Sequence, residues 1–169
     1  VAADGLLYMA DYRASERAFQ VLTQVAGRAG RGEQPGRVIL QTYTPEHPVI
    51  EAVQRQSVTA FIQAELEQRQ ALSYPPWGRL VLLRITSPDA GLVERTAHGL
   101  AATLAPQVGD AWQILGPAPA PIARVARRYR WHLMLKGAIA APLPDLTGLA
   151  AQCPQSVSLT VDIDPLHLG

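Results

Sequence analysis

The stretch Arg130-Trp131-His132-Leu133-Met134-Leu135-Lys136 alternates between two kinds of side chain. Trp131, Leu133 and Leu135 occupy every second position, and His132 lies between them. Successive side chains of a strand point to opposite faces of a sheet. The stretch therefore predicts a strand with Trp131 on the same side as the two leucines.

Further elements flank this strand within residues 78–169. The apolar pattern predicts strands at 80–85, 112–115 and 157–163, helices at 92–105 and 145–152, and an extended segment at 122–125. Asp89 is a candidate cap of the first helix. The resulting order, β-α-β-β-α-β, predicts an α/β domain with a small ferredoxin-like arrangement.

The preceding residues divide into two further segments. Residues 1–45 have the pattern of strand, helix, turn and strand, with strands expected at 5–10 and 38–43 and a helix capped by Ser15 and ended by glycines from Gly27 on. The first strand would belong to a sheet whose other strands are absent, so we expect a piece of a longer protein. Residues 46–77 are predicted as a helical linker, interrupted near Ser57 and stopped by two prolines.

A second motif lies where the predicted helix of residues 1–45 ends. It has the form Q-x-x-G-R-x-x-R, with Gln24, Gly27, Arg28 and Arg31 at its fixed positions. Two arginines at this spacing can direct fixed positive charge at a phosphate. The chain has no G-x-x-x-x-G-K-[ST] loop to cradle the phosphates. The motif therefore indicates half of a nucleotide site, or alternatively an ordinary helix end with two solvated arginines.

A basic and aromatic cluster precedes and overlaps the strand quoted first. Between residues 121 and 136 there are five Lys or Arg side chains and no acidic ones. Arginines bind phosphates and aromatic rings stack on unpaired bases, so the cluster predicts DNA contact. In the alternative, Trp131 belongs to the core and the arginines are a solvated edge. The candidate residues are Arg124, Arg127, Arg128, Tyr129, Arg130, Trp131 and His132.

Composition restricts the remaining classes. Hydrophobic residues make up 48% and charged residues 17% of the 169 residues, which indicates a folded globular protein. The formal net charge of +1 means that nucleic-acid binding needs a local basic patch. The single cysteine, Cys153, excludes a disulfide framework or a Cys-rich zinc site within this chain. No apolar run reaches the ~18 residues of a membrane span, so we expect a cytoplasmic location.

The motifs in their order resemble the primosomal replication-restart helicases, a branch of helicase superfamily 2. The Q-x-x-G-R-x-x-R motif resembles helicase motif VI, and the resemblance extends over essentially the whole chain. Further matching segments are Asp11-Tyr12-Arg13-Ala14-Ser15-Glu16-Arg17, Gly36 to Pro48, Tyr74-Pro75-Pro76-Trp77, Leu115 to Pro121, Arg128-Tyr129-Arg130-Trp131 and Asp162-Ile163-Asp164-Pro165.

For the fold and the nucleotide site, the resemblance implies the following. Residues 1–45 would end the second RecA-like helicase lobe, 46–77 would be a linker, and 78–169 a C-terminal DNA- or partner-binding domain. Arg28 and Arg31 would face a triphosphate, with Arg31 as the arginine finger, Gln24 contacting the nucleotide or coupling the lobes, and Gly27 allowing close approach. ATP with Mg²⁺ would be bound mainly by an upstream lobe. The family's zinc-binding cysteines would also lie upstream.

For activity and partners, the resemblance implies an ATP-dependent 3′–5′ DNA helicase. It would recognise stalled forks and D-loops and initiate primosome assembly for replication restart. Its partners would be forked and single-stranded DNA, the single-stranded DNA-binding protein, primosome proteins and the replicative helicase, in the bacterial cytoplasm at the nucleoid. The alternative is a non-enzymatic fork-DNA or protein-binding scaffold with an inactive helicase remnant.

Overall fold

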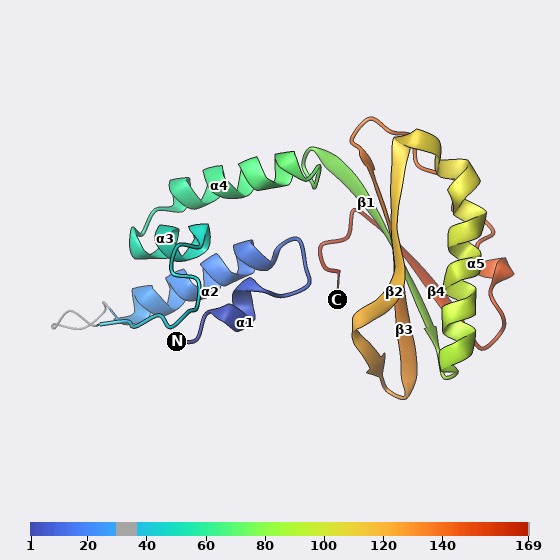
Figure 1. The fold of residues 1–169 in the computed structure, drawn as a ribbon, viewed down its shortest axis with the longest axis horizontal. Coiled ribbons are helices and arrows are strands. Elements are labelled where there is room, and N and C mark those ends of the chain that lie inside the picture. Colours follow the sequence, from blue (N-terminus) through green and yellow to red (C-terminus); the bar gives the residue numbers. More distant parts are fainter. Residues whose placement is uncertain (30–36, 169) are drawn as a thin grey trace. The chain divides into compact units, whose positions relative to one another are not determined.

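A computed structural model describes residues 1–29 and 37–168 of the chain. The chain divides into two compact units, Val1–Ala71 and Leu72–Gly169. In Figure 1 the first unit is coloured from blue to green and the second from green to red. Arg31, one of the residues expected in the nucleotide site, lies outside the described residues.

The first unit is built from helices. They are α1 (Asp4–Leu7), α2 (Ala14–Ala29), α3 (Pro48–Gln54) and α4 (Val58–Ala71). α3 begins where His47 Nδ1 accepts a hydrogen bond from the Val49 amide, and proline suits the first helical position because no amide partner is needed there. The Ser57 hydroxyl accepts a hydrogen bond from the Ala60 amide at 3.2 Å. The predicted interruption near Ser57 is therefore confirmed.

The helices of the first unit share one apolar cluster. Leu22 of α2 and Ile50 of α3 are almost completely buried. The rings of Phe19 in α2 and Phe61 in α4 stack with their centroids 4.2 Å apart. Burial of these side chains from three helices gives the first unit a core of its own.

The strands predicted at 5–10 and 38–43 are wrong. α1 forms in the first segment, where two amides donate hydrogen bonds to the Ala3 carbonyl. Among the described residues, the two segments pair only through an isolated parallel bridge between Ala2 and Gln41. A short apolar run fits a helix or a strand equally well. A single bridge provides fewer backbone hydrogen bonds than a full strand ladder would. The local helical turn therefore satisfies more backbone amides and carbonyls than strand pairing does here.

The start of α2 also differs from the prediction. The helix begins at Ala14, so Ser15 lies inside its first turn and is not the N-cap. The chain turns instead at Asp11, whose Oδ1 accepts a hydrogen bond from the Arg13 amide at 2.9 Å. An Asp carboxylate closes such turns more strongly than a Ser hydroxyl. At its other end, α2 continues through Gly27 to Ala29, so Gly27 does not end the helix.

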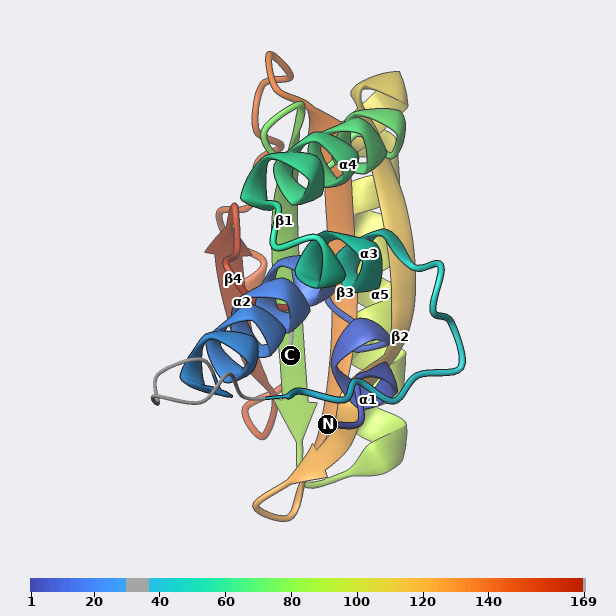
Figure 2. The same ribbon diagram turned by 90° about the vertical axis from the view of Figure 1, so that its left-hand side faces the viewer.

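The second unit is an antiparallel sheet with helix α5 packed on it (Figures 1 and 2). The strands are β1 (Gly78–Ser87), β2 (Trp112–Val125), β3 (Arg128–Ala138) and β4 (Ser158–Ile163), in the order β2-β3-β1-β4. α5 (Ala90–Val108) begins at Asp89, whose Oδ1 accepts a hydrogen bond from the Leu92 amide at 2.8 Å. The predicted cap is therefore confirmed.

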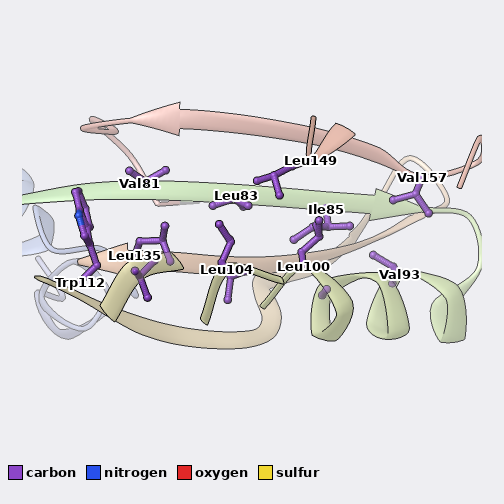
Figure 3. Packing of buried hydrophobic residues seen from close by; sticks show 13 residues of the cluster. Val81, Leu83, Ile85, Val93, Leu100, Leu104, Trp112, Leu135, Leu149 and Val157 are labelled. Atoms are coloured by element: carbon purple, nitrogen blue, oxygen red, sulfur yellow. The ribbon is translucent and has the colours of Figure 1, made fainter. Parts of the chain in front are cut away.

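The core of the second unit lies between α5 and one face of the sheet, which we call the α5 face. In the pairing of β1 with β3, Val81 is opposite Leu135 and Leu83 is opposite Leu133. Figure 3 shows Val81, Leu83 and Leu135 in one layer with side chains of α5 such as Leu104. The predicted alternation of β3 thus holds, because both of its leucines are buried in this layer.

Two other predictions for the second unit are corrected. Residues 145–152 form no α-helix and contain only a 3₁₀ turn, Ala150–Gln152. The Asp145 carboxylate accepts hydrogen bonds from both the amide and the hydroxyl of Thr147, and Gly148 has a φ of 74°, which a right-handed helix excludes. The segments 112–115 and 122–125 belong to the single strand β2, which is irregular on either side of Ala118 and Pro119.

β2 is an edge strand of the sheet. It carries prolines at every second position, Pro117, Pro119 and Pro121. Proline has no amide hydrogen to donate to a neighbouring strand, so strands of this composition are confined to sheet edges.

The α/β class is confirmed by this four-stranded sheet and its helices. The ferredoxin-like assignment and the RecA-like origin of the first unit stay predictions. Of the helices within 1–29 and 37–168, none combines the length and hydropathy needed to cross a membrane.

Candidate nucleic-acid interface

The basic cluster lies at the hairpin between β2 and β3. Val125 and Arg128 form the last pair before the turn, and Ala126 and Arg127 connect them with φ angles of 48° and 63°. Two residues with positive φ make the turn type that follows the right-handed twist of a hairpin. The turn thus places one arginine at its tip and others along both strands. We call Arg124, Arg127, Arg128 and Arg130 the hairpin arginines.

Arg128 is fixed across the sheet by neutral partners. Its Nη2 donates hydrogen bonds to the carbonyl oxygens of Thr86, at 2.9 Å, and Ser156, at 3.2 Å. The same nitrogen donates to the Ser158 hydroxyl at 3.2 Å, and Nε donates to the Thr86 hydroxyl at 3.2 Å. These acceptors orient the guanidinium without cancelling its charge.

The other hairpin arginines are held less firmly. The Cζ of Arg124 lies 4.9 Å from the centre of the Tyr129 ring, a cation–π contact. Arg130 Nη1 donates a long hydrogen bond of 3.5 Å to the Ile122 carbonyl. Arg127 is exposed, and within the described chain it has no hydrogen-bond or ion-pair partner.

Ion pairing divides the arginines of the second unit into two groups. Arg79 contacts Asp164 at 2.8 Å and Arg84 contacts Asp162 at 3.1 Å, both between β1 and the β4 end of the chain. Within residues 1–29 and 37–168, none of the hairpin arginines forms an ion pair with an acidic residue. Uncompensated positive charge is therefore concentrated at the hairpin, although the net charge is only +1.

The two aromatic residues of the cluster pack inward. Tyr129 and Trp131 are partly buried against the core on the α5 face, and Trp131 meets the His98 ring of α5 edge-on with centroids 5.7 Å apart. This packing agrees with the interpretation of Trp131 as a core residue. A role of either ring in stacking on bases stays a prediction.

His132 lies on the opposite face of the sheet, where it pairs with Arg84 of β1. Burial, followed by the positive charges of Arg130 and Arg84, lowers the pKa of His132 to about 4. Its Nε2 is buried and has no hydrogen-bond partner in the described structure. His132 is therefore neutral near pH 7 and adds no charge to the cluster.

The nucleotide motif lies at the end of α2 in the first unit. Gln24, Gly27 and Arg28 are exposed, and their spacing of three and four residues places them on one face of the helix. A Cβ built on Gly27 meets no atom within 4 Å, so nothing in the described chain requires a glycine there. Because Arg31 lies outside the described residues, its position relative to Arg28 stays a prediction.

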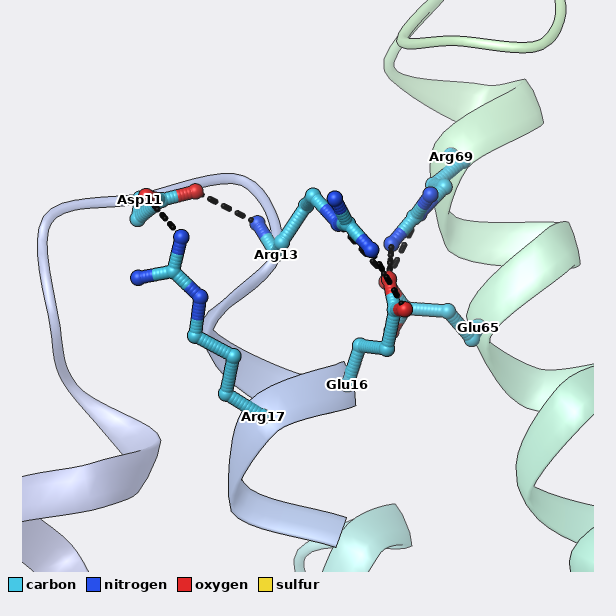
Figure 4. Close-up of polar contacts among 6 residues, drawn as sticks. All are labelled: Asp11, Arg13, Glu16, Arg17, Glu65 and Arg69. Atoms are coloured by element: carbon cyan, nitrogen blue, oxygen red, sulfur yellow. Dashed lines mark hydrogen bonds and ion pairs between the residues drawn. The ribbon is translucent and has the colours of Figure 1, made fainter. Parts of the chain in front are cut away.

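Sequence reasoning missed a charge cluster that joins two helices of the first unit (Figure 4). Glu65 and Arg69 lie four residues apart on α4 and contact each other at 2.7 Å. Arg69 also contacts Glu16 of α2 at 3.2 Å, and Glu16 contacts Arg13 at 2.7 Å. The hydrogen bond from Arg13 is the main cause of the lowered pKa of Glu16. The segment Asp11 to Arg17 thus connects α2 to α4.

The described residues contain no group of three or more His, Cys, Asp or Glu side chains that could hold a metal ion. The hairpin arginines are fixed cations, which can bind and orient anionic groups.

Comparison with known proteins identifies the family. The model of the primosomal protein N C-terminal domain matches residues 70–166. Replication restart protein PriA of Synechocystis sp. is 52% identical over 170 residues, which cover 99% of this chain and 20% of that protein. The proteins of the same name from Bacillus subtilis and Haemophilus influenzae are 41% and 32% identical, covering 80% and 100% of this chain and 17% and 24% of those proteins.

The chain spans about a fifth of the length of these relatives. The match includes both strands of the hairpin and thus all four hairpin arginines. Residues 70–166 carry the family's C-terminal domain, and the chain belongs to the family of replication restart protein PriA.

Proposed function

We propose that this chain acts within an ATP-dependent 3′–5′ DNA helicase for replication restart, and that its second unit contacts forked DNA through the hairpin arginines. The observation that carries the DNA contact is the group of arginines without acidic partners at one hairpin. Forked and single-stranded DNA present dense phosphate charge, and arginines that release counterions from it supply sequence-independent affinity. Stalled forks and D-loops would be the substrates.

In this proposal the hairpin positions DNA and performs no bond chemistry. Arg128 is held by carbonyl and hydroxyl oxygens, so its guanidinium keeps a fixed direction. Arg124 is supported by Tyr129, and Arg130 is held only loosely. Phosphate contacts of this kind fix the orientation of a protein on DNA without reading its sequence.

The residues at the end of α2 fit the arginine side of an ATP site. Gln24 and Arg28 are exposed one helical turn apart, and Arg28 has no ion-pair partner among the described residues. ATP with Mg²⁺, held mainly by residues beyond this chain, would supply the energy of phosphoryl transfer. Arg28 and Arg31 would place positive charge where negative charge develops, with Arg31 as the finger. Zinc ligands would likewise lie outside this chain.

The partners of the proposed protein are the single-stranded DNA-binding protein, other primosome proteins and the replicative helicase, at the nucleoid of a bacterial cytoplasm. The second candidate function is a non-enzymatic fork-DNA or protein-binding scaffold. One observation favours it. The hairpin arginines lie entirely within the second unit, so a DNA contact made by them would not require the residues at the end of α2.

The proposed DNA contact is tested by fluorescence anisotropy of the purified chain with a labelled fork, a single strand and a duplex across a salt series. Replacing Arg124 and Arg130 together by Gln should flatten the plot of log K against log salt by about 0.9 per lost phosphate contact. Arg95→Gln, which removes one positive charge at an exposed arginine of α5, is the control for charge loss away from the hairpin. No DNA binding by the folded chain at low salt would refute the proposal.

ATP hydrolysis by a protein that carries this chain together with the upstream lobe then separates the two candidate functions. DNA-stimulated hydrolysis supports the helicase. Fork binding without any hydrolysis supports the scaffold.

A further inference from the structure

Resting on the proposed DNA contact, we propose that the β2–β3 turn enters a groove of duplex DNA, with Arg127 at its leading point. Of the forked DNA in the proposed function, the part that this hairpin contacts is therefore the duplex arm. The inference depends on the geometry of the turn, on the placement of charge on both faces of the hairpin, and on the packing of its aromatic rings.

The first observation is an arginine at a backbone position that does not suit it. Arg127 has a φ of 63° and Ala126 a φ of 48°, in the left-handed region where Gly and Asn are accommodated with the least strain. Arg127 is exposed and has no partner within the described residues, so it contributes nothing visible to the fold. Arg127 is a long, positively charged side chain at a strained backbone position, and it has no hydrogen-bond or ion-pair partner within the described residues. Such a side chain is suited to contact a partner outside the chain.

The second observation is that the turn projects from the sheet. The last pair between β1 and β3 joins Ser87 to Tyr129. β2 and β3 continue to the pair of Val125 and Arg128, beyond the reach of β1. Figure 2 shows the turn extending past the end of β1. A two-stranded ribbon of this kind is an element that the major groove of B-DNA admits.

The third observation is that cations lie on both faces of the ribbon. Arg124 lies over Tyr129, which packs on the α5 face. Arg128 is next to Tyr129 in β3 and therefore lies on the opposite face, where it donates to Ser158 of β4. With Arg127 between the strands, one ribbon presents cations to the floor and to both phosphate walls of a groove.

The fourth observation favours duplex over single-stranded DNA. Single-strand sites present exposed aromatic rings on which bases stack. Here the ring of Tyr129 is covered by Arg124, and Trp131 packs against the core and His98. The large apolar side chains exposed on the hairpin are Ile122 and Val125, which offer no stacking face. The hairpin therefore presents side chains that can contact phosphates and groove edges.

The test replaces Arg127 by Gly and, separately, by Asn, both of which suit a positive φ. The purified chain is titrated by anisotropy against a blunt duplex and a single strand of equal length. We expect the melting temperature to stay the same or rise. Duplex affinity should fall about eightfold at 0.1 M salt, with a log–log slope flatter by about 0.9, as for the loss of one phosphate contact. Single-strand affinity should change less than duplex affinity.

The outcomes separate this inference from the proposed function. If Arg127→Gly leaves the duplex slope unchanged while the Arg124 and Arg130 double variant flattens it, the hairpin binds DNA but its turn does not enter a groove. If the unaltered chain binds no DNA, the proposed function fails as well. Equal losses for duplex and single strand would overturn the duplex assignment. Arg95→Gln controls for the loss of one positive charge.

Discussion

Arg124 and Tyr129 form a cross-strand pair in the hairpin, with the Arg124 Cζ 4.9 Å from the centre of the Tyr129 ring. The pair couples the basic cluster to the core, because Tyr129 also packs on the α5 face. Tyr129 therefore supports the side chain of Arg124 and also packs against the core of the domain.

The first prediction concerns this pair. Tyr129→Leu should weaken duplex binding by a few-fold and lower the free energy of unfolding by about 1 kcal/mol, because the cation–π contact is lost while the charge is kept. Tyr129→Phe keeps an aromatic face and should behave like the unaltered chain in both measurements. Anisotropy titration and urea denaturation provide the comparison, and an equal effect of both substitutions would argue against the contact.

The second prediction concerns His132. Its pKa in the folded chain, about 4, lies below the ordinary histidine value of 6.5, so the unfolded chain binds protons more readily between these values. Stability is therefore fully present above pH 6.5 and should decrease as pH falls toward 4. In the unaltered chain the free energy of unfolding should differ by on the order of 2 kcal/mol between the two ends of this pH range, and His132→Leu should remove that difference.

Denaturant unfolding at several pH values checks the His132 prediction. His98→Gln is the matched control, because His98 is an exposed histidine on α5. The same dependence in both variants would show that another group causes it.

The third prediction concerns Glu16. Its pKa is lowered, chiefly by the hydrogen bond from Arg13, so the stability that it contributes is present above the ordinary glutamate value of 4.5 and is lost as pH falls through the lower folded value. Glu16→Gln should destabilise the first unit by about 1 kcal/mol at neutral pH, since the side chain is partly exposed. Glu51→Gln, which affects only the exposed pair with Arg55, should have a smaller effect in the same denaturation experiment.

The fourth prediction concerns Gly137. A Cβ built there lies 2.5 Å from Cδ2 of Trp112, whose Nε1 is tied to the Pro142 carbonyl at 2.8 Å. Gly137→Ala should destabilise the second unit by about 2 kcal/mol through this overlap. Gly99→Ala on α5, where an added Cβ meets no atom within 4 Å, should be neutral or stabilising. Thermal unfolding followed by tryptophan fluorescence would reveal the difference, and equal stabilities would contradict it.

The fifth prediction tests the nucleotide motif in a protein that carries this chain together with the upstream lobe. Arg31→Ala should abolish DNA-stimulated ATP hydrolysis and leave DNA affinity within a few-fold, because a finger acts on the transition state. Arg55→Ala, on the exposed pair with Glu51, is a control that should leave hydrolysis unchanged. Unaltered hydrolysis by the Arg31 variant would remove this arginine from the site.

The sequence predicts those features of the fold that depend on neighbouring residues, and it misses those that depend on contacts between distant residues. Alternation in β3 identified the buried positions of Leu133 and Leu135 because strand periodicity is a property of neighbouring residues. Asp89 was identified as a cap for the same reason. The apolar run at 145–152 suggested a helix, but the hydrogen bonds of Asp145 and the positive φ of Gly148 bend the chain instead.

Two features of the candidate sites had no sequence signal. The turn at Ala126 and Arg127 lacks the Asn or Gly that usually indicates a two-residue hairpin. The contact of Glu16 with Arg69 joins residues that are 53 positions apart, which no periodicity connects. Arg124, Arg127, Arg128 and Arg130 were recognised from composition, whereas their lack of acidic partners required the structure.

The prolines of β2 also affect how the protein behaves among copies of itself. An exposed strand edge is a template on which another chain can add, which leads to aggregation. At positions 117, 119 and 121 the edge has no amide hydrogen to offer an incoming strand. The domain is thereby protected on this edge from joining other copies of itself through their sheets.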